Sequence, residues 1–584
     1  MASAVPQRSE RSRVLVVGVY LLGAPTWVHE ITETLTSTRA HDVEVLWAAL
    51  GEGSVPEALA DITPVVASGS TDKFTLVNQV IAHHDLSNFD VLLVTDDDVS
   101  FEPGWLDAFL SLQADADLAL CQPARSPDSW IDHPFTKQLL GIDARLTHYV
   151  EIGPVFSLHR KAFELLVPFD ESWPMGWGLD LRWPVILGEA GLQMGIIDRV
   201  PVLHRLRPPQ AHYSAGRTRD RMSSALDGAS VLDRDTAQRA LSTRVEGRWS
   251  TSANVAVEDP KISVVIATRN REDLLTKALG ALVAQNIDRD DFEVIVIDDG
   301  STDDIPRVID KFAGLLHIQY ARQDPSGLAS ARNHGLFLSN GEIVIFLDDD
   351  DVADTSLLGV HIAAHRRYPE PQVAILGYTG LAVDVGHSLL MRHITGAAGN
   401  QYLSHVSMMN QGVLDFTEFW GGRVSAKRSW LVQHEVFDPQ FDFGFEDIEL
   451  GYRLARHGLV VRYEAQARLT IIRTFTLDGF LQRTMKQGRS MATASSLHPD
   501  SSFVTTAAHL VDDARFASPD PQLIEELTAR TQELLDLADD AIAHNVLLAP
   551  SVEAEIGHCI NYLHHVYLVQ GYHQFVSEHS RQTS

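Results

Sequence analysis

The sequence predicts an α/β protein with two similar α/β blocks, followed by a helical region near its C-terminal end. Three observations carry this prediction. Short buried-strand runs alternate with helical stretches in two separate parts of the chain. Sequence landmarks of the first block recur in the same order in the second block. Leucines near the C-terminal end recur at helical spacing.

The composition places the chain among acidic globular proteins. Its 584 residues are enough for at least two domains, and 45% of them are hydrophobic, which argues against general disorder. The formal net charge of −31 argues against nucleic acid as a partner, because phosphate backbones select basic surfaces. Two cysteines, Cys121 and Cys559, cannot build a disulfide framework or a thiolate metal site. This cysteine usage is typical of a reducing compartment, so we expect a cytoplasmic protein.

We expect no transmembrane segment. The longest uncharged apolar stretch near the start, residues 14–28, is too short to span a bilayer and contains glycine and proline. It opens with a β-branched run, and Glu10 interrupts the basic residues before it, which argues against a signal peptide. We interpret the run as a buried first strand.

The two α/β blocks are expected at residues 12–210 and 259–495. Both contain continuous apolar runs, such as 91–94 and 343–347, of the kind found in a parallel sheet covered on both faces. Residues 211–258 between them are rich in Ser, Thr, Asp and Arg, which predicts a linker with room for one helix.

Residues 500–584 are predicted to form a helical region. Asp520 and Pro521 offer an N-cap followed by proline at the first helical position. Residues at helical spacing then predict two helices; they are Leu523, Leu527, Leu534 and Leu537 for the first, and Ile556, Ile560, Leu563 and Tyr567 for the second. The histidines of the second helix, His558, His564 and His565, are interpreted as surface or packed residues rather than ligands.

Three landmarks indicate an internal duplication. RVLVV at 13–17 matches ISVVI at 262–266, and NFDVLLVTDDDV at 88–99 matches NGEIVIFLDDDDV at 340–352. The third pair is Asp180, in GLD, and Asp447, in FED. Their common order favours duplication over chance.

Acidic clusters follow a buried strand in each block. Asp348 to Asp351 come directly after 343–347, and Asp96 to Asp98 hold the matching place in the first block. Ligands of open α/β sheets bind outside the carboxyl ends of the strands. Neighbouring carboxylates repel by roughly 1 kcal/mol per pair in water, and a divalent cation relieves this repulsion. Oxygen ligands suit Mg²⁺ or Mn²⁺, which would hold a diphosphate; a solvated acidic turn is the alternative.

Two further acidic motifs lie in the second block. Asp299, in DDGS after the strand at 293–297, could accept hydrogen bonds from a base or a ribose, although such a motif is often only a turn. Glu446 and Asp447 are flanked by phenylalanines, and carboxylates in such settings can act as general bases. Acidic enrichment of a helix N-terminus is the other interpretation.

The second block resembles an inverting glycosyltransferase of family 2 with the GT-A fold, a Rossmann-like nucleotide-diphospho-sugar transferase fold. The resemblance covers about residues 261–495 and is carried by six ordered motifs: KISVVIATRNRED, VIDDGSTDD, GLASARNHG, IVIFLDDDDV, WGGRVSAKRSWL and FEDIELGYRL.

The resemblance implies roles for eight residues of the second block. Thr268, Arg269 and Asp299 would line the nucleotide pocket, and Arg332 would lie near the diphosphate. Asp348 and Asp350 would form the DxD pair, with Asp350 as the direct metal ligand. Asp447 would be the catalytic base, and Glu446 would orient the acceptor.

Two features depart from the family pattern. Many relatives carry a metal-binding His after the ED motif, whereas ARLTIIRTFT at 467–476 has none. Either Arg473 contacts the diphosphate directly, or metal dependence is weak. Arg423 stands where relatives often have Asn, so the resemblance leaves the acceptor contacts open.

The first block resembles a more distant GT-A domain. It lacks a DDGS motif but keeps the acidic cluster, and the pair is either Asp96 with Asp98 or Asp97 with Asp98. Asp180 takes the place of Asp447, and His204 falls where the metal-binding His of such domains lies.

The sequence therefore predicts a bifunctional glycosyltransferase with two GT-A domains in tandem. Each would use a nucleotide-diphosphate sugar, a UDP-sugar as the favoured donor, and Mn²⁺ or Mg²⁺. The acceptor would be a glycan or another hydroxyl compound, as in polysaccharide biosynthesis. Two alternatives stay open: a single active second domain with a non-catalytic, acceptor-binding first domain, or a carbohydrate-binding scaffold.

Overall fold

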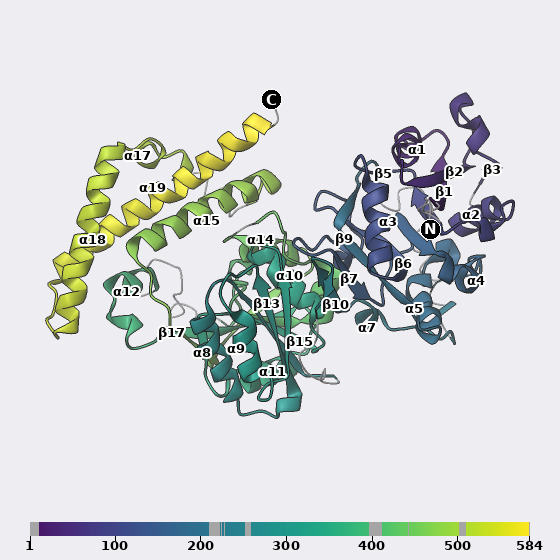
Figure 1. The fold of residues 1–584 in the computed structure, drawn as a ribbon. Coiled ribbons are helices and arrows are strands. Elements are labelled where there is room, and N and C mark those ends of the chain that lie inside the picture. Colours follow the sequence, from purple (N-terminus) through teal and green to yellow (C-terminus); the bar gives the residue numbers. More distant parts are fainter. Residues whose placement is uncertain are drawn as a thin grey trace, which may run out of the picture. The chain divides into compact units, whose positions relative to one another are not determined.

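The computed structural model describes residues 11–69, 71–208, 222, 225–226, 228–250, 259–395, 412–441, 443–501 and 510–582. The chain divides into two compact units, Met1–Ser250 and Thr251–Ser584 (Figure 1). Both units have a β-sheet with helices packed on it, and the second unit continues into long helices. The α/β class and the helical C-terminal region are confirmed.

The sheet of the first unit has the strand order β11-β10-β7-β9-β6-β8-β4-β1-β2-β3, with β5 paired to β9. The strands are β1 (Ser12–Leu21), β2 (His41–Leu50), β3 (Val65–Ala67), β4 (Val91–Asp96), β5 (Val99–Ser100), β6 (Leu118–Arg125), β7 (Ala144–Thr147), β8 (Val155–His159), β9 (Gln193–His204), β10 (Ala240–Val245) and β11 (Arg248–Trp249). Strands β2, β1 and β4 are parallel, but β8 runs antiparallel between β4 and β6. The prediction of a parallel sheet is therefore right only for part of it.

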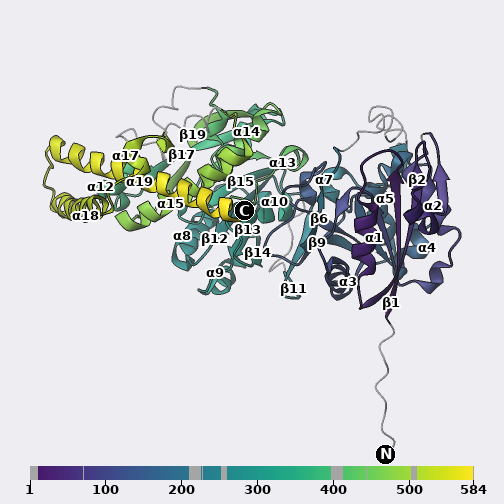
Figure 2. The ribbon, with the colours of Figure 1, turned by 90° about the horizontal axis from the view of Figure 1, so that it is seen from above.

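Strand β1 lies inside the sheet between β4 and β2 and is buried, as the buried-strand interpretation predicts. Leu15 and Val17 pack on one face of the sheet, against α2 (Lys73–Ile81), α4 (Phe163–Leu166) and α5 (Leu179–Glu189). Val14 and Val16 pack on the other face, against α1 (Val28–Thr36) and α3 (Trp105–Asp115). Figure 2 shows α1 and α2 on opposite sides of β1. Burial on both faces explains why the strand reads as a continuous apolar run.

The expectation of a linker at 211–258 is wrong for its second half. Residues 234–237 form the short helix α7 (Arg234–Ala237), and β10 pairs with β7, so this part belongs to the first sheet. Strand β10 has few large apolar residues and lies next to the edge of the sheet, between β7 and the short strand β11. The remaining positions of the expected linker lie largely outside the described residues.

The sheet of the second unit has the strand order β14-β13-β12-β15-β18-β17-β19-β16. The strands are β12 (Ile262–Thr268), β13 (Phe292–Asp299), β14 (Ile318–Gln323), β15 (Ile343–Asp348), β16 (Asp351–Ala353), β17 (Val373–Leu381), β18 (Val424–Lys427) and β19 (Val460–Ile471). The first four are parallel, and β18 runs antiparallel to β15 and β17, so this sheet is also mixed.

Helices cover both faces of the second sheet. Apolar residues of α8 (Glu272–Val283), α9 (Ile305–Phe312) and α11 (Leu357–Arg367) pack with Val264 and Ile266 on one face. On the opposite face lies α10 (Leu328–Leu338), where Gly335 comes close to Val265. The remaining helices before the C-terminal region are α12 (Leu389–Thr395), α13 (Arg428–His434) and α14 (Glu446–Ala455).

The C-terminal helices are α15 (Leu477–Leu497), α17 (Ala514–Ala517), α18 (Pro521–Ala543) and α19 (Pro550–Gln582). Asp520 caps α18 as predicted, since its carboxylate accepts a hydrogen bond from Gln522 N at 3.0 Å. The predicted leucine face is only partly right, because Leu523 and Leu537 are half exposed or more and Leu535 is buried instead. Within the described residues, no helix has the length and apolarity needed to cross a membrane.

Helices α15 and α19 lie side by side and meet through two glycines (Figure 1). A Cβ atom at Gly488 would lie 2.9 Å from the carbonyl carbon of Leu568, and one at Gly571 would lie 2.9 Å from that of Met485. Each glycine thus faces the backbone of the other helix, and the two helix axes approach more closely than side chains would allow.

Candidate active site

One pocket of about 960 Å³ lies at the carboxyl ends of β12, β13 and β15 in the second unit. These ends meet because the strands are parallel and in register, with Thr268 opposite Asp298 and Ala267 opposite Asp348. All eight residues predicted for this unit line the pocket, namely Thr268, Arg269, Asp299, Arg332, Asp348, Asp350, Glu446 and Asp447. The structure therefore brings together residues that are up to 179 positions apart in the sequence.

Each aspartate of the acidic cluster has an arginine partner. The N–O distances are 3.1 Å for Arg332 and Asp348, 2.7 Å for Arg271 and Asp349, 3.3 Å for Arg473 and Asp350, and 3.4 Å for Arg423 and Asp351. The sequence argument assigned the neutralisation of these carboxylates to a divalent cation. The structure shows that arginines of the chain itself supply much of it.

The four aspartates differ in environment. Burial raises the pKa of Asp349 to about 6 and that of Asp351 to about 8, against the charges of their arginine partners. Burial also acts on Asp348, but the charges of Arg332 and Arg423 outweigh it and lower its pKa. Asp351 belongs to β16 and its side chain has no exposed surface, so it serves the core rather than the pocket.

The predicted nucleotide-binding residues are held by hydrogen bonds. Thr268 Oγ1 donates to Asp349 Oδ2 at 2.7 Å. Asp299 Oδ1 accepts from Gln323 Nε2 at 2.8 Å and from Ser326 N at 2.7 Å, which fixes the loop before α10. Arg269 lies 3.9 Å from Asp299, and half of its side chain is exposed, so its guanidinium is free to meet a ligand at the pocket mouth.

Arg332 links the two halves of the site. Its Nη2 lies 3.1 Å from Asp348 Oδ1, and its Nη1 lies 2.7 Å from Glu446 Oε1. Burial and the charge of Asp447 raise the pKa of Glu446 to about 7. Arg332 is itself almost fully buried, so its charge cannot be screened by water and holds both carboxylates in place.

The neighbouring residue, Asp447, is held by backbone groups at the start of α14. Its Oδ2 accepts a hydrogen bond from Gly421 N at 3.1 Å, and its Oδ1 accepts one from Ile448 N at 2.9 Å. The loop that carries Gly421 and Gly422 comes so close to Arg332 and Asp348 that a side chain at either glycine would overlap them. The WGG sequence is thus required by the packing of this loop on the site.

Sequence reasoning missed the contributions of the C-terminal helices. Gln482, Arg483, Lys486 and Gln487 of α15 line the pocket, as do Asn561, His564, His565 and Leu568 of α19. The ring of His564 stacks on Phe480 with centroids 5.7 Å apart, and burial lowers its pKa to about 3. The interpretation of this histidine as a packed residue is right, although it also faces the pocket. A cationic pair at i and i+3 on a helix was the only sequence signal for the α15 residues.

The acidic residues fit a divalent cation only in part. Among the described residues, no three His, Cys, Asp or Glu side chains come together as a metal site. Mg²⁺, however, often takes only one or two protein carboxylates together with substrate phosphates. Asp350, with Asp348 nearby, is the carboxylate that could hold an ion in this way.

The acidic cluster of the first unit is also paired with cations. Asp96 lies 2.6 Å from Lys73, Asp98 lies 3.3 Å from His204, and Arg207 contacts both Asp97 and Asp98. Strand β5 pairs with β9 here as β16 pairs with β19 in the second unit. Beside these strand pairs, Asp98 contacts His204 in the first unit, and Asp350 contacts Arg473 in the second unit.

The predicted base of the first unit, Asp180, is enclosed. It lies in the first turn of α5 and is only 6% exposed, and burial raises its pKa. Near it lies a buried network that the sequence did not indicate, in which Arg125 contacts His204 Nδ1 at 3.1 Å and Glu151 at 2.5 Å. Burial raises the pKa of Glu151 to about 7.

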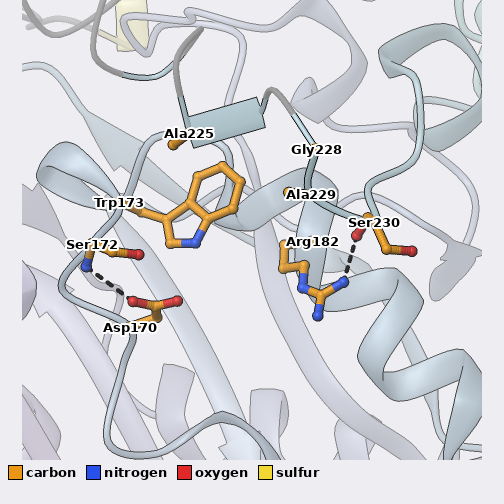
Figure 3. A pocket seen from close by; sticks show the side chains of 8 residues that line it. All are labelled: Asp170, Ser172, Trp173, Arg182, Ala225, Gly228, Ala229 and Ser230. Carbon is orange, nitrogen blue, oxygen red and sulfur yellow. Dashed lines mark hydrogen bonds between the residues drawn. The ribbon is translucent and has the colours of Figure 1, made fainter.

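A separate pocket of about 460 Å³ lies in the first unit (Figure 3). Asp170 accepts a hydrogen bond from Ser172 N at 2.9 Å, and Arg182 donates to the Ser230 carbonyl at 2.6 Å. The indole of Trp173 lies between these groups but is buried. None of the residues predicted for the first unit's site lines this pocket.

Comparison with known proteins identifies part of the second unit. Residues 263–437 match the family model "Glycosyl transferase family 2". The chain is 30% identical over 261 residues to validoxylamine A glucosyltransferase of Streptomyces hygroscopicus subsp. limoneus, which covers 40% of this chain and 57% of that protein. It is 29% identical to hyaluronan synthase of Pasteurella multocida over 34% of this chain and 23% of that protein. The chain thus spans little more than half of the first relative and less of the second.

Solved structures give similar matches. TarS 1–349 of S. aureus in complex with UDP has a TM-score of 0.32 at 16% identity, covering 56% of this chain and 92% of that chain. The mannosyltransferase PcManGT from Pyrobaculum calidifontis, in complex with GDP-Man and Mn²⁺, has a TM-score of 0.35 at 17% identity, covering 55% and 90%. Residues 263–437 are thus similar to glycosyltransferases of family 2, and the predicted enzyme class, a glycosyltransferase, is confirmed.

Proposed function

We propose that the chain transfers a sugar from a nucleotide-diphosphate donor to a hydroxyl acceptor in the pocket of the second unit. The observation that carries the proposal is the convergence of all eight predicted residues on one pocket within or next to the family 2 domain. The relatives support it, since their names describe a glucosyltransferase and a hyaluronan synthase. A UDP-sugar is the favoured donor, because TarS has been solved with UDP-GlcNAc as well as with UDP.

Asp447 is assigned the role of general base. Its carboxylate is held at the pocket by hydrogen bonds from the Gly421 and Ile448 N–H groups. It takes the proton of the acceptor hydroxyl while that oxygen attacks the anomeric carbon from the side opposite the diphosphate, which inverts the configuration. Glu446, fixed by Arg332, positions the acceptor beside it.

The donor occupies the end of the pocket at β12, β13 and β15. Thr268, Arg269 and Asp299 meet the nucleoside, and Arg332 and Asp348 meet the diphosphate side. Asp350 could hold Mg²⁺ or Mn²⁺, and such an ion would neutralise charge on the leaving diphosphate.

The acceptor is a glycan or another compound rich in hydroxyl groups. Uncharged polar side chains and aromatic rings suit such a ligand, and the pocket wall formed by the C-terminal helices carries both. Gln482 and Gln487 of α15, Asn561 of α19, and the rings of Phe475 and Phe480 line it.

A second active site in the first unit is the other candidate. The 3.3 Å pair of Asp98 and His204 favours it, because a carboxylate and an imidazole suit a divalent ion. The ion pairs of Lys73 and Arg207 and the enclosure of Asp180 favour the non-catalytic alternative, in which this unit binds the acceptor.

Matched variants decide between these candidates. The purified chain is incubated with UDP-glucose, UDP-GlcNAc or GDP-mannose, and nucleotide release is measured for Asp350→Asn and Asp98→Asn. We expect Asp350→Asn to abolish release and Asp98→Asn to leave it unchanged. A transfer that only Asp98→Asn removes would show two active sites. Nucleotide binding without any turnover by the unaltered chain would point to the carbohydrate-binding scaffold.

A further inference from the structure

The pocket of the second unit is locally basic in a strongly acidic chain. Among the described residues that line it, seven are Arg or Lys and six are Asp or Glu, whereas the whole chain has a net charge of −31. Such a site attracts an anion.

Arg483 contacts two aromatic rings of the pocket. Its guanidinium carbon lies 4.5 Å from the ring centre of Phe443 and 5.5 Å from that of Phe475, so the aromatic rings hold it. Within the part of the chain that the structure describes, no carboxylate lies within ion-pair distance of Arg483. Burial lowers its pKa although Asp348 and Asp350 are nearby, which means that its charge is incompletely balanced.

Two more cations lie beside Arg483. Arg473 also contacts Phe475, with its guanidinium carbon 4.5 Å from the ring centre, and it lies 3.3 Å from Asp350. In the first unit, Asp98 of the acidic cluster contacts a histidine instead, His204 at 3.3 Å. A guanidinium cannot bind a metal ion, but its planar fork matches phosphate oxygens. Lys486, one turn after Arg483 on α15, is exposed at the same pocket.

We propose that Arg473, Arg483 and Lys486 bind the donor's diphosphate, so that nucleoside diphosphates bind to the second unit without a divalent cation. The inference rests on the proposed function and deepens it. Arg473 exchanges its contact with Asp350 for a phosphate oxygen. When the bond between the anomeric carbon and the diphosphate breaks, its electron pair stays on the diphosphate oxygen, and the new negative charge lies against these cations.

Calorimetric titration of the full chain with UDP, and with GDP in parallel, tests the proposal in EDTA and in MnCl₂. We expect the dissociation constant of one nucleotide to change by less than threefold between the two conditions. In EDTA, Arg483→Gln should weaken binding at least tenfold, or about 1.4 kcal/mol. Lys486→Gln alters an exposed residue and should also weaken nucleotide binding. It replaces Arg483→Gln as the test if that variant does not fold. Arg462→Gln is the control. The guanidinium carbon of Arg462 lies 4.1 Å from the ring centre of Tyr368, and Arg462 does not line the pocket.

Two results would overturn the inference while leaving the proposed function intact. One is nucleotide binding that EDTA abolishes and Mn²⁺ restores. The other is unchanged affinity in both Arg483→Gln and Lys486→Gln. Absence of UDP and GDP binding under both conditions would overturn the inference together with the proposed function.

Discussion

Replacing Gly571 with alanine should loosen α19 from α15 and thereby open one wall of the pocket. The new Cβ atom would lie 2.9 Å from the carbonyl carbon of Met485 and closer still to its oxygen, and Cβ atoms essentially never come within 3.0 Å of another heavy atom. The obstacle is backbone, which cannot rotate away as a side chain can. The two helices must therefore separate, and Asn561 and His564 on α19 move with them.

The size of the effect follows from two opposing terms. Forcing an extra carbon into a close-packed contact costs about 1–3 kcal/mol. Alanine in a helix is favoured over glycine by roughly 0.5–1 kcal/mol. The net change in the free energy of unfolding should therefore be a loss of up to about 2 kcal/mol. Gly280 in α8 is the matched control, since a Cβ atom there meets nothing within 4 Å. Gly280→Ala should therefore raise the free energy of unfolding by the helix preference of alanine alone.

Urea denaturation and hydrogen exchange measure this prediction. Exchange should accelerate in α15 and α19 of Gly571→Ala and stay unchanged in the strands of the second sheet. The KM for the acceptor should rise more than the affinity for UDP falls, since α19 lines the pocket on the side assigned to the acceptor. Equal stabilisation of the chain by Gly571→Ala and Gly280→Ala would refute the close-packed contact.

Two further predictions concern buried charges. The raised pKa of Glu446, about 7, means that the folded state keeps a proton which the unfolded state loses above its ordinary value of 4.5. The free energy of unfolding should therefore fall between pH 5 and pH 8, and it should fall less in Glu446→Gln. Urea denaturation at the two pH values measures this difference. An identical fall in both proteins would contradict the prediction. Arg145 and Asp198 of the first unit form an ion pair at 2.9 Å with no exposed surface, so Arg145→Met should cost roughly 3–5 kcal/mol by urea denaturation. The exposed pair of Lys161 and Asp117 is its control, where Lys161→Met should cost about 0–1 kcal/mol, and similar losses in both would count against this account of burial.

Local sequence patterns indicated Asp299 and Asp348, and the family resemblance added Thr268, on the side of the pocket that is proposed to bind the donor. Thr268, Asp299 and Asp348 each end a continuous apolar run, and parallel strands in register bring such ends to one edge. The strand character of a segment and the place of a residue at its end both follow from local sequence, so they can be predicted from a single sequence. The antiparallel strands β8 and β18 were not predictable, because their pairing depends on contacts between distant segments.

The charge balance of the site could not be predicted for the same reason. Repulsion among Asp348 to Asp351 was recognised correctly, but the neutralising groups were not, because Arg473 is 123 residues from Asp350 in the sequence. Arg483 lies still further along the chain on a helix without a family motif. The overall composition did not indicate this pocket, since the net charge is −31 while cations outnumber acids among the described residues that line the pocket.

The rate of nucleotide release from a nucleotide-sugar by Asp447→Asn tests the central claim most directly. Asp180→Asn is its matched control, because both aspartates lie in the first turn of a helix, α14 in one unit and α5 in the other. The account predicts that Asp447→Asn lowers the rate by about 10²–10⁴-fold with unchanged UDP affinity, as loss of a general base does, and that Asp180→Asn keeps the full rate. A full rate in Asp447→Asn would contradict the assignment of the active site to the second unit.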